Sequence, residues 1–424
     1  MTMISRLVVA MILWGATLPA QDIAGDWQGT LKTASPLRLV LRFTKDTDGG
    51  WKGTLFSIDQ GTEGYKADTV TLQGSDLKVS LDGIRATYEA KISADGSTIE
   101  GTYKQGKPLP LELKRATKET AWSTDATSHT VQFVTVDTDV KLEVLDWGGT
   151  GRPLVFLTGL GNNAHVFDKF ASKFIGSYHV YGITRRGYGT SSSPASGYSA
   201  DRLGDDVLAV LEALKINKPV LVGHSIGGEE LSSVGSRHPE KVAGLIYLDA
   251  GYSYAYYDTA KGDLNIDVLE LQKKLGQLLP GAGPQDLRPL VRELLNTGLP
   301  GLEKDLKEMQ KNLELNPPPA IAGPAPPMPA AARGILAGMQ KYTEIKVPIL
   351  AIYALPHDLG PQFKGDRSAA EARDVASTGA QAKAFETGLP SARVVRLEHA
   401  NHYVFLSNEA DVMREMNAFL AGLP

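Results

Sequence analysis

Apolar and polar residues alternate along the N-terminal quarter of the chain, from about residue 21 to residue 115. A period of two is typical of strands that bury one face. Asp48-Gly49-Gly50 and Asp95-Gly96 have the residue types of hairpin turns. We expect about six to eight strands here, which predicts a small antiparallel β barrel or sandwich. The clearest alternating run places its apolar residues at Leu37, Leu39, Leu41 and Phe43.

The pattern changes from about residue 130 onward, where short and wholly apolar runs alternate with amphipathic segments. Strands without polar residues suit a parallel sheet that is covered on both faces. We therefore expect an α/β fold with a mostly parallel, doubly wound sheet. The expected strands are 131–136, 140–147, 154–157, 179–183, 219–222, 242–248, 347–353 and 392–397, and the expected helices are 201–214, 228–237 and 409–421.

Residues 251–345 interrupt this alternation. They contain no convincing strand but several amphipathic runs, which predict an inserted helical cap. The Pro-rich stretch 316–329 should form an extended, semi-rigid strap, because proline does not continue a helix. The expected helices lie near 264–279, 285–296, 301–314 and 331–341.

Residues 1–20 have the pattern of a secretory signal peptide. Arg6 is the basic start, an apolar run extends to Leu18, and Ala20 is a small residue at the expected cleavage point. This run is shorter than the about 20 residues that a membrane span needs. We therefore expect export to a periplasm or beyond, with no stable membrane span once the signal is removed.

The boundaries follow from these changes of pattern. A β-rich domain is expected at 21–115 and an α/β domain at 130–424. Residues 116–129, rich in Thr, Ser, Lys and Glu, should link the two. The role of the β-rich domain stays open between a stabilising spacer and a module that binds a lipid, a polymer or a partner protein.

Composition narrows the classes of function. The chain has 44 Lys and Arg against 48 Asp and Glu, a formal charge of −4, so it lacks the basic footprint of a nucleic-acid binder. Its 424 residues contain no cysteine, which excludes disulfides, thiol catalysis and zinc thiolate sites. A small molecule or another protein is therefore the expected partner.

The strongest chemical signal is Gly223-His224-Ser225-Ile226-Gly227, which follows the apolar strand 219–222 and precedes a helix. A serine hydroxyl becomes a nucleophile when a tight turn lifts it toward a base and above backbone donors, and flanking glycines permit that turn. Ser225 is therefore the candidate nucleophile. His224 should be a packed neighbour, because adjacent residues on such a turn point apart.

With these residues, the chain from about residue 131 to the C-terminus resembles an α/β-hydrolase-fold serine hydrolase. The resemblance implies an oxyanion hole formed by the backbone N–H groups of Leu160 and Ile226. The preceding Thr158-Gly159 keeps the glycine of the family's His-Gly pair and replaces its histidine. The turn Thr184-Arg185-Arg186-Gly187-Tyr188-Gly189-Thr190-Ser191 is similar to a turn that has a structural role in the family.

The resemblance also implies a base and an acid. His402, between the last strand and the last helix, occupies the base position, and His399 is its competitor. Asp358 is the preferred acid, because the acid of this family usually follows the penultimate strand, here 347–353, and the order Ser225, Asp358, His402 agrees with that of the fold. Asp249, at the end of strand 242–248, is the alternative acid. The two histidines lack a third ligand at sensible spacing, so no metal is expected.

Two further groups lie close to these positions in the sequence. Tyr252, Tyr254, Tyr256 and Tyr257 stand where the core strand passes into the cap, and they either line a substrate pocket or anchor the cap. Glu229 and Glu230 directly follow the serine turn. Acidic residues in the first turn of a helix are favourable to its macrodipole, which is sufficient explanation for them. A role in orienting a water molecule stays open as the alternative.

Together these features predict a secreted, cofactor-free serine hydrolase that cleaves a carboxylic ester or lactone through an acyl-enzyme. A large-ring lactone of the macrolide type is a variant of the same substrate class. Two alternatives stay open: a catalytically inactive binding or scaffold protein of the same fold, and a haloperoxidase-like perhydrolase that uses the same triad. The sequence does not bear on the oligomeric state.

Overall fold

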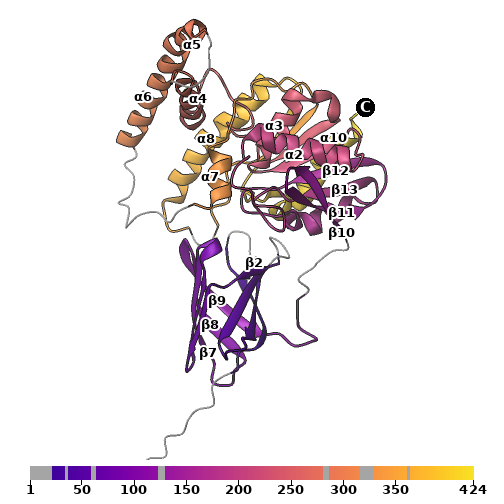
Figure 1. The fold of residues 1–424 in the computed structure, drawn as a ribbon, viewed down its shortest axis with the longest axis vertical. Coiled ribbons are helices and arrows are strands. Elements are labelled where there is room, and N and C mark those ends of the chain that lie inside the picture. The colour runs from indigo at the N-terminus through magenta and orange to yellow at the C-terminus, as the bar shows by residue number, and fades with distance from the viewer. Residues whose placement is uncertain are drawn as a thin grey trace, which may run out of the picture. The chain divides into compact units, whose positions relative to one another are not determined.

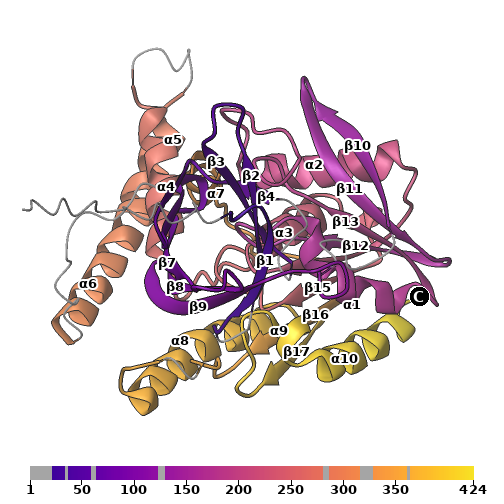
Figure 2. The same ribbon diagram turned by 90° about the horizontal axis from the view of Figure 1, so that it is seen from below.

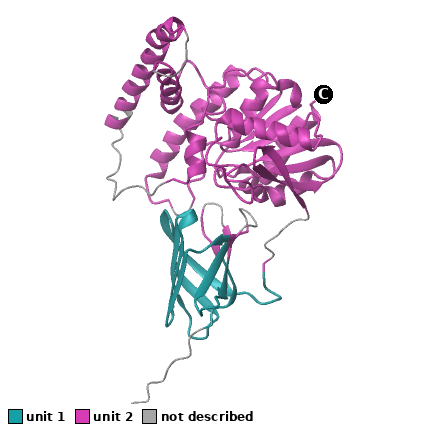
Figure 3. Cartoon of the chain, viewed as in Figure 1, with its two compact units in different colours: residues 1–29, 41–55, 65–121 teal, residues 30–40, 56–64, 122–424 magenta. Residues whose placement is uncertain are grey.

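The computed structural model describes residues 22–33, 37–58, 64–122, 129–279, 286–315, 328–360 and 363–424. The expected signal peptide, most of the expected linker and most of the Pro-rich strap lie outside these residues. Contacts within the chain define two compact units: residues 1–29, 41–55 and 65–121, and residues 30–40, 56–64 and 122–424 (Figure 3). In the described residues, no helix is both long and apolar enough to cross a membrane.

The N-terminal strands form one antiparallel, curled sheet of nine strands in the order β4-β3-β2-β1-β9-β8-β7-β6-β5 (Figure 2). The expected alternation is present, since Leu39, Leu41 and Phe43 of one strand are buried. The sheet has more strands than the sequence pattern predicts. Its strands are β1 (Gly25–Leu31), β2 (Leu37–Lys45), β3 (Trp51–Ser57), β4 (Gly64–Lys66), β5 (Thr69–Gln73), β6 (Asp76–Leu81), β7 (Ala86–Ile92), β8 (Thr98–Gln105) and β9 (Lys107–Arg115).

The second sheet has eight strands in the order β10-β11-β13-β12-β14-β15-β16-β17 (Figure 1). The pairs β10–β11 and β11–β13 are antiparallel, and every later pair is parallel. The expected α/β fold with a mostly parallel sheet is confirmed. The strands are β10 (Thr130–Asp137), β11 (Val140–Gly148), β12 (Arg152–Leu157), β13 (Tyr178–Ile183), β14 (Val220–His224), β15 (Gly244–Leu248), β16 (Ile349–Ala354) and β17 (Ala392–Leu397).

Helices bury both faces of this sheet, which explains its wholly apolar strands. Along β12, Val155 and Leu157 belong to one buried cluster, and Leu154 and Phe156 belong to another on the opposite face. The first cluster includes side chains of α2 (Ala200–Ala213), α3 (Gly227–Arg237) and α8 (Arg367–Gly388). The second includes side chains of α1 (Asp168–Ala171), α9 (Val404–Ser407) and α10 (Glu409–Ala421). Figure 2 shows α2 and α10 on opposite sides of the sheet.

A helical insertion separates β15 from β16, where the sequence predicts it. It contains α4 (Leu264–Gly276), α5 (Arg288–Glu293), the π-helical turn Leu294–Gly298, α6 (Leu299–Leu315) and α7 (Ala330–Leu336). These elements agree with the expected helices to within a few residues. The sequence pattern does not predict α8, because its buried side consists mainly of small residues and shows no stripe of large apolar side chains.

Candidate active site

Ser225 stands on a tight turn between β14 and α3. Its φ is +52°, a left-handed conformation that a non-glycine residue rarely adopts. The turn is held by its backbone, since Ser225 N–H donates to Leu248 O at 3.2 Å. Gly228 allows the close approach of the following helix, because a Cβ there would lie 2.2 Å from Ala250 O. The sequence therefore forms the strained turn that the Gly-rich motif predicts.

His402 lies between β17 and α9, and its imidazole contacts Asp249. The distance from His402 Nδ1 to Asp249 Oδ2 is 2.6 Å, so Nδ1–H donates to an ionised carboxylate. Asp249 directly follows β15, the strand that neighbours β14 in the sheet, and its side chain is fully buried. The His402 side chain is 40% exposed, which leaves the other edge of the ring accessible to a substrate.

Of the two candidate acids, the structure brings Asp249 and not Asp358 against His402. The Asp358 carboxylate accepts a hydrogen bond from Gly360 N–H at 2.8 Å and closes a local turn. Within the described residues it makes no contact with His402, whereas Asp249 does. Asp249, the alternative acid in the sequence, is thus the one placed beside the imidazole. Sequence order alone does not separate the two, because both follow a strand of the same sheet.

His357, the residue before Asp358, also contacts Asp249, and the sequence does not predict this contact. His357 Nε2 lies 2.8 Å from Asp249 Oδ2, and His357 Nδ1 lies 2.9 Å from Asp374 Oδ2 on α8. Burial favours the neutral ring, but the hydrogen bonds and charges of the two carboxylates raise the pKa of His357 to about 9. Burial also favours the neutral form of Asp249 and by itself would raise the pKa of this carboxyl. The hydrogen bonds and charges of His357 and His402 outweigh burial and lower the pKa of Asp249 to about 2.

The four tyrosines divide between two roles. Tyr252 OH donates to Asp249 Oδ1 at 3.0 Å, and the hydroxyl of Tyr254 interacts with the Ser225 side chain. Tyr256 packs edge-on against Phe385 with ring centroids 5.9 Å apart. Tyr257 OH donates to Asp267 of α4 at 2.7 Å. Tyr252 and Tyr254 therefore lie at the site, and the other two fix the start of the helical insertion.

The loop after β12 passes directly beside the serine turn. A Cβ on Gly159 would lie 2.8 Å from His224 Nδ1 and 3.2 Å from the Ser225 Cβ, so this approach requires glycine. In the described part of the chain, neither Leu160 N–H nor Ile226 N–H donates to a backbone acceptor. An oxyanion hole requires amides without a backbone acceptor, and both residues meet this condition.

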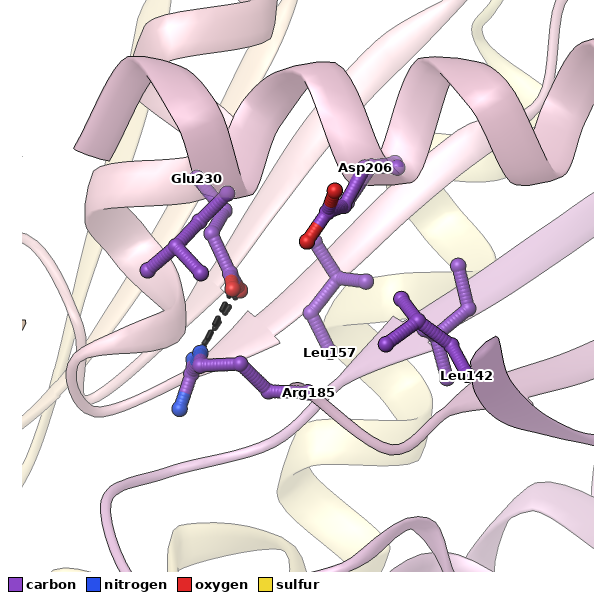
Figure 4. Close-up of a pocket in the computed structure, with 8 residues that line it drawn as sticks. Leu142, Leu157, Arg185, Asp206 and Glu230 are labelled. Atoms are coloured by element: carbon purple, nitrogen blue, oxygen red, sulfur yellow. Dashed lines mark hydrogen bonds and ion pairs between the residues drawn. The ribbon is translucent and has the colours of Figure 1, made fainter. Parts of the chain in front are cut away.

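Arg185 contacts the backbone of this loop. Its Nη2 donates to Thr158 O at 2.7 Å, and its Nε and Nη2 donate to the two oxygens of Glu230 at 2.5 and 2.9 Å. Glu230 is thus a structural counter-ion, a role that the helix-macrodipole argument does not predict. The pair borders a cavity of about 10 Å³ (Figure 4), which has room for about one water molecule.

Glu229 has no such partner. Its side chain is fully buried, and both carboxylate oxygens lack a hydrogen bond within the described structure. Burial raises the pKa of Glu229 well above its usual value. Since Arg185 is already paired with Glu230, no free cation among the described residues compensates a charge on Glu229, and burial favours the protonated form of this carboxyl.

The other two histidines that the sequence singles out, His224 and His399, are not placed as bases. His224 is buried, its Nε2 faces His402 O at 3.1 Å, and burial together with His402 lowers its pKa to about 3. This neutral, packed ring agrees with the sequence interpretation. His399 is exposed, and its side chain makes no hydrogen bond among the described residues. Its backbone N–H is fixed to Pro356 O.

Among the residues that the structure describes, two groups of side chains have the composition of a metal site. Asp249, His357 and His402 form one, and His129, His165 and Asp168 form the other, each with potential ligand atoms within 4.8 Å of one another. In the second group, His165 lies between two carboxylates, 3.2 Å from Asp168 and 3.7 Å from Glu143. Although burial opposes it, these partners raise the pKa of His165 to about 9, so an ion-pair network already accounts for the group.

Comparison with known proteins finds matches to part of this chain. The family model of the alpha/beta hydrolase fold matches residues 152–299. The 3-oxoadipate enol-lactonase 2 of Acinetobacter baylyi is 35% identical over 104 residues, 24% of this chain and 39% of that protein. The bifunctional esterase/perhydrolase DCH of Acinetobacter calcoaceticus is 32% identical over 121 residues, 28% of this chain and 44% of that protein.

The chain spans less than half the length of these curated relatives. Among solved structures, the esterase EaEST from Exiguobacterium antarcticum is 17% identical, with 69% of this chain and 100% of that chain covered and a TM-score of 0.45. The matched segment 152–299 contains the serine turn, and the strand order around it is the one described above. The region from β10 to α10 is therefore an α/β-hydrolase-fold domain.

Proposed function

We propose that this chain is a serine-dependent hydrolase of carboxylic esters or lactones, with Ser225, His402 and Asp249 as its catalytic residues. The observation that carries the proposal is the 2.6 Å contact between His402 and Asp249, in a sheet whose neighbouring strand β14 ends at the left-handed Ser225. This combination of an elbow serine, a base and a buried acid activates a hydroxyl for attack on a carbonyl.

The proposed reaction begins when His402 Nε2 accepts the Ser225 proton and the serine oxygen attacks the carbonyl carbon. The tetrahedral oxyanion is stabilised by the backbone N–H groups of Leu160 and Ile226. His402 then gives the proton to the leaving alcohol, and an acyl-enzyme remains. Water, activated by the same imidazole, releases the acid. These steps use only side chains and amides of this chain, so no cofactor is needed.

The substrate class follows from the surroundings of the serine. Tyr252 and Tyr254 bring aromatic rings beside Ser225 and Asp249, and the helical insertion begins directly after them. Aromatic walls favour a bulky and partly apolar acyl group or ring. A lactone, including one of large ring size, therefore belongs to the same proposal as an open ester. The name of one relative, an enol-lactonase, agrees with it.

Perhydrolysis is a second candidate. One relative is named an esterase/perhydrolase, and others are named non-heme chloroperoxidases. Attack of hydrogen peroxide in place of water on the acyl-enzyme yields a peracid from the same residues. Peracid formation from acetate or an acetate ester with peroxide would distinguish this activity from simple hydrolysis.

The serine is tested with a fluorophosphonate probe and a panel of esters and lactones of increasing acyl size. We expect covalent labelling and turnover of at least one panel member by the full chain. Ser225→Ala should abolish labelling and lower kcat/KM by about 10³-fold or more. Turnover by Ser225→Ala within threefold of the parent would refute the proposal. Absence of labelling in folded parent protein would favour an inactive binding or scaffold protein.

We also propose that the protein is exported. The support is the sequence of residues 1–20, with Arg6 ahead of an apolar run that ends at Leu18. Mass spectrometry of protein recovered from the periplasm or medium of an expressing bacterium tests this. A new N-terminus close to residue 21 is the expected result, and an intact Met1 in the cell interior would contradict it.

A further inference from the structure

Behind the proposed catalytic acid lies a second histidine that the reaction scheme does not use. His357 donates from Nε2 to Asp249 at 2.8 Å and from Nδ1 to Asp374 at 2.9 Å. Asp374 also accepts from His357 N–H at 2.7 Å and from the Thr378 hydroxyl at 2.8 Å. Both ring nitrogens therefore face carboxylates, and the orientation of the imidazole is fixed.

His357 and His402 share one acceptor atom. Each imidazole contacts Asp249 Oδ2, at 2.8 and 2.6 Å, and the ring centroids are 6.3 Å apart. The other oxygen, Asp249 Oδ1, accepts from Tyr252 OH and Ala354 N–H, both at 3.0 Å. Asp249 thus has four donors, and its position against His402 is fixed from three directions.

We propose that His357, oriented by Asp374, is a positioning residue of the hydrolytic site that supplies a fixed positive charge behind Asp249, holds this carboxylate on His402, and extends the activity of the site to lower pH. This inference rests on the proposed function. The proposal assigns a role to α8, since that helix carries Asp374. It also assigns a role to His357, which follows β16 and directly precedes Asp358, the acid that the sequence favours.

Charge balance supports the proposal. From α8 toward the serine, Asp374, His357 and Asp249 carry charges of −1, +1 and −1, and the His402 imidazole comes next. The cation on His357 offsets the attraction that Asp249 alone would exert on a proton at His402. A unit charge 6.3 Å away changes the protonation of a neighbouring imidazole by about 0.5 to 1 pH unit at an effective dielectric constant of about 40 to 80.

The other groups around the two imidazoles do not substitute for this charge. Tyr252, from the segment after β15, lies 3.4 Å from His357 Nε2, and its pKa is raised by burial and by Asp249, so it stays neutral. His224 of β14 faces His402 and has a pKa lowered to about 3, so it is also neutral. Tyr403 contacts the His402 ring as a neutral phenol, with centroids 5.8 Å apart.

The test compares variants at residue 357 by the pH dependence of fluorophosphonate labelling, which needs no known substrate. His357→Gln removes the charge and keeps a side-chain donor, and His357→Lys keeps the charge. We expect the acid limb of the labelling rate to move up by about 0.5 to 1 pH unit in His357→Gln. In His357→Lys it should stay within about 0.2 unit of the parent. His357→Asn replaces the glutamine variant if that variant fails to fold.

Asp358→Asn is the matched control, because it lies next to His357 but its carboxylate contacts only Gly360 among the described residues. Its acid limb should not move. An unchanged acid limb in His357→Gln, with folding verified by circular dichroism, would overturn the proposal, since a purely structural residue alters the rate or stability but not the titration. An acid limb that moves equally in His357→Gln and His357→Lys would also overturn the proposal.

Two further readouts separate the possible failures. Labelling that survives in Ser225→Ala would reject the proposed function itself, whereas labelling that depends on Ser225 but ignores His357 rejects only this inference. Asp249, His357 and His402 also have the composition of a metal site. Labelling by the parent should therefore be measured after EDTA treatment and after addition of Zn²⁺. No change on chelation is expected, and loss with recovery on zinc addition would overturn the charge-based role.

Discussion

At the scale of single residues, the choice of acid depends on a contact that the sequence does not reveal. Asp249 and Asp358 both follow strands of one sheet, and the sequence favours the second only because the commonest arrangement of the family places the acid after the penultimate strand. The structure places His357 at the end of β16, and Asp358 turns toward Gly360. The places of Ser225 and His402 in the fold were predictable, because the Gly-rich motif follows an apolar strand and His402 stands between the last strand and the last helices. The catalytic roles of these residues and of the Leu160 and Ile226 amides stay predictions.

This difference gives a prediction on the two aspartates. Asp249→Asn should lower kcat by about 10³- to 10⁴-fold, because an amide no longer fixes the tautomer of His402 or stabilises its cation. Asp358→Asn should retain kcat within threefold. Steady-state hydrolysis of the best ester in the panel provides the measurement, with circular dichroism as the check on folding. The reverse outcome, with Asp358→Asn as the inactive variant, would restore the acid that the sequence favours.

At the scale of elements, the strands and the inserted helices were predictable because large apolar side chains mark their buried positions. Helix α8 was not, since its buried positions are Thr378, Ala382, Ala384 and Phe385. With α8 missing from the prediction, Asp374 and its contact with His357 could not be anticipated either. The pattern of apolar residues thus predicts elements that bury large side chains. It does not predict a helix that packs mainly through small residues such as alanine.

Helix α3 provides a prediction of its own, because two adjacent glutamates at its start have opposite environments. Glu230 is paired with Arg185, and Glu229 is buried with no hydrogen-bond partner in the described structure. The raised pKa of Glu229 means that the unfolded chain releases its proton first as pH rises above about 4.5, which favours unfolding. Glu229→Gln removes this cost, so it should stabilise the protein by on the order of 1 to 3 kcal/mol at pH 7.

Chemical denaturation at pH 5 and at pH 8 measures this effect, and the gain should be larger at pH 8. Glu230→Gln is the matched comparison on the same helix turn. It leaves Arg185 without its counter-ion in a buried site, so it should destabilise the protein by about 3 to 5 kcal/mol. If Glu229→Gln destabilises the protein as much as Glu230→Gln does, both glutamates are ionised in the folded protein.

At the scale of the whole molecule, both sheets were predictable because each follows a simple rule: period-two alternation in the N-terminal sheet, and wholly apolar strands between helices in the α/β region. Three titratable groups of the α/β region, all outside its strands, set how the stability of that region depends on pH. His165 and His357 both have a pKa raised to about 9. The pKa of Asp249 is lowered to about 2. Each of these groups binds protons differently in the folded and unfolded states, so each contributes to stability only over a defined pH range.

The sign differs between the histidines and the aspartate. The histidine contributions are fully present below about pH 6.5, the value in an unfolded chain, and are lost as pH rises through 9. The Asp249 contribution is present above about pH 3.9 and is lost as pH falls through 2. We therefore expect these three groups to contribute most between about pH 4 and 6.5, with the denaturation midpoint of the α/β region falling on either side.

His165→Gln tests the alkaline side of this range, because it removes one of the two histidines and lies outside the proposed site. It should lower the denaturant midpoint at pH 6 and have little effect at pH 10, where the parent histidine has already lost its proton. His399→Gln, at an exposed ring without a hydrogen bond in the described chain, should change the midpoint at neither pH. If the His165→Gln penalty is the same at pH 6 and pH 10, His165 stabilises the fold by packing alone, and the ion-pair network of Glu143, His165 and Asp168 does not contribute through charge.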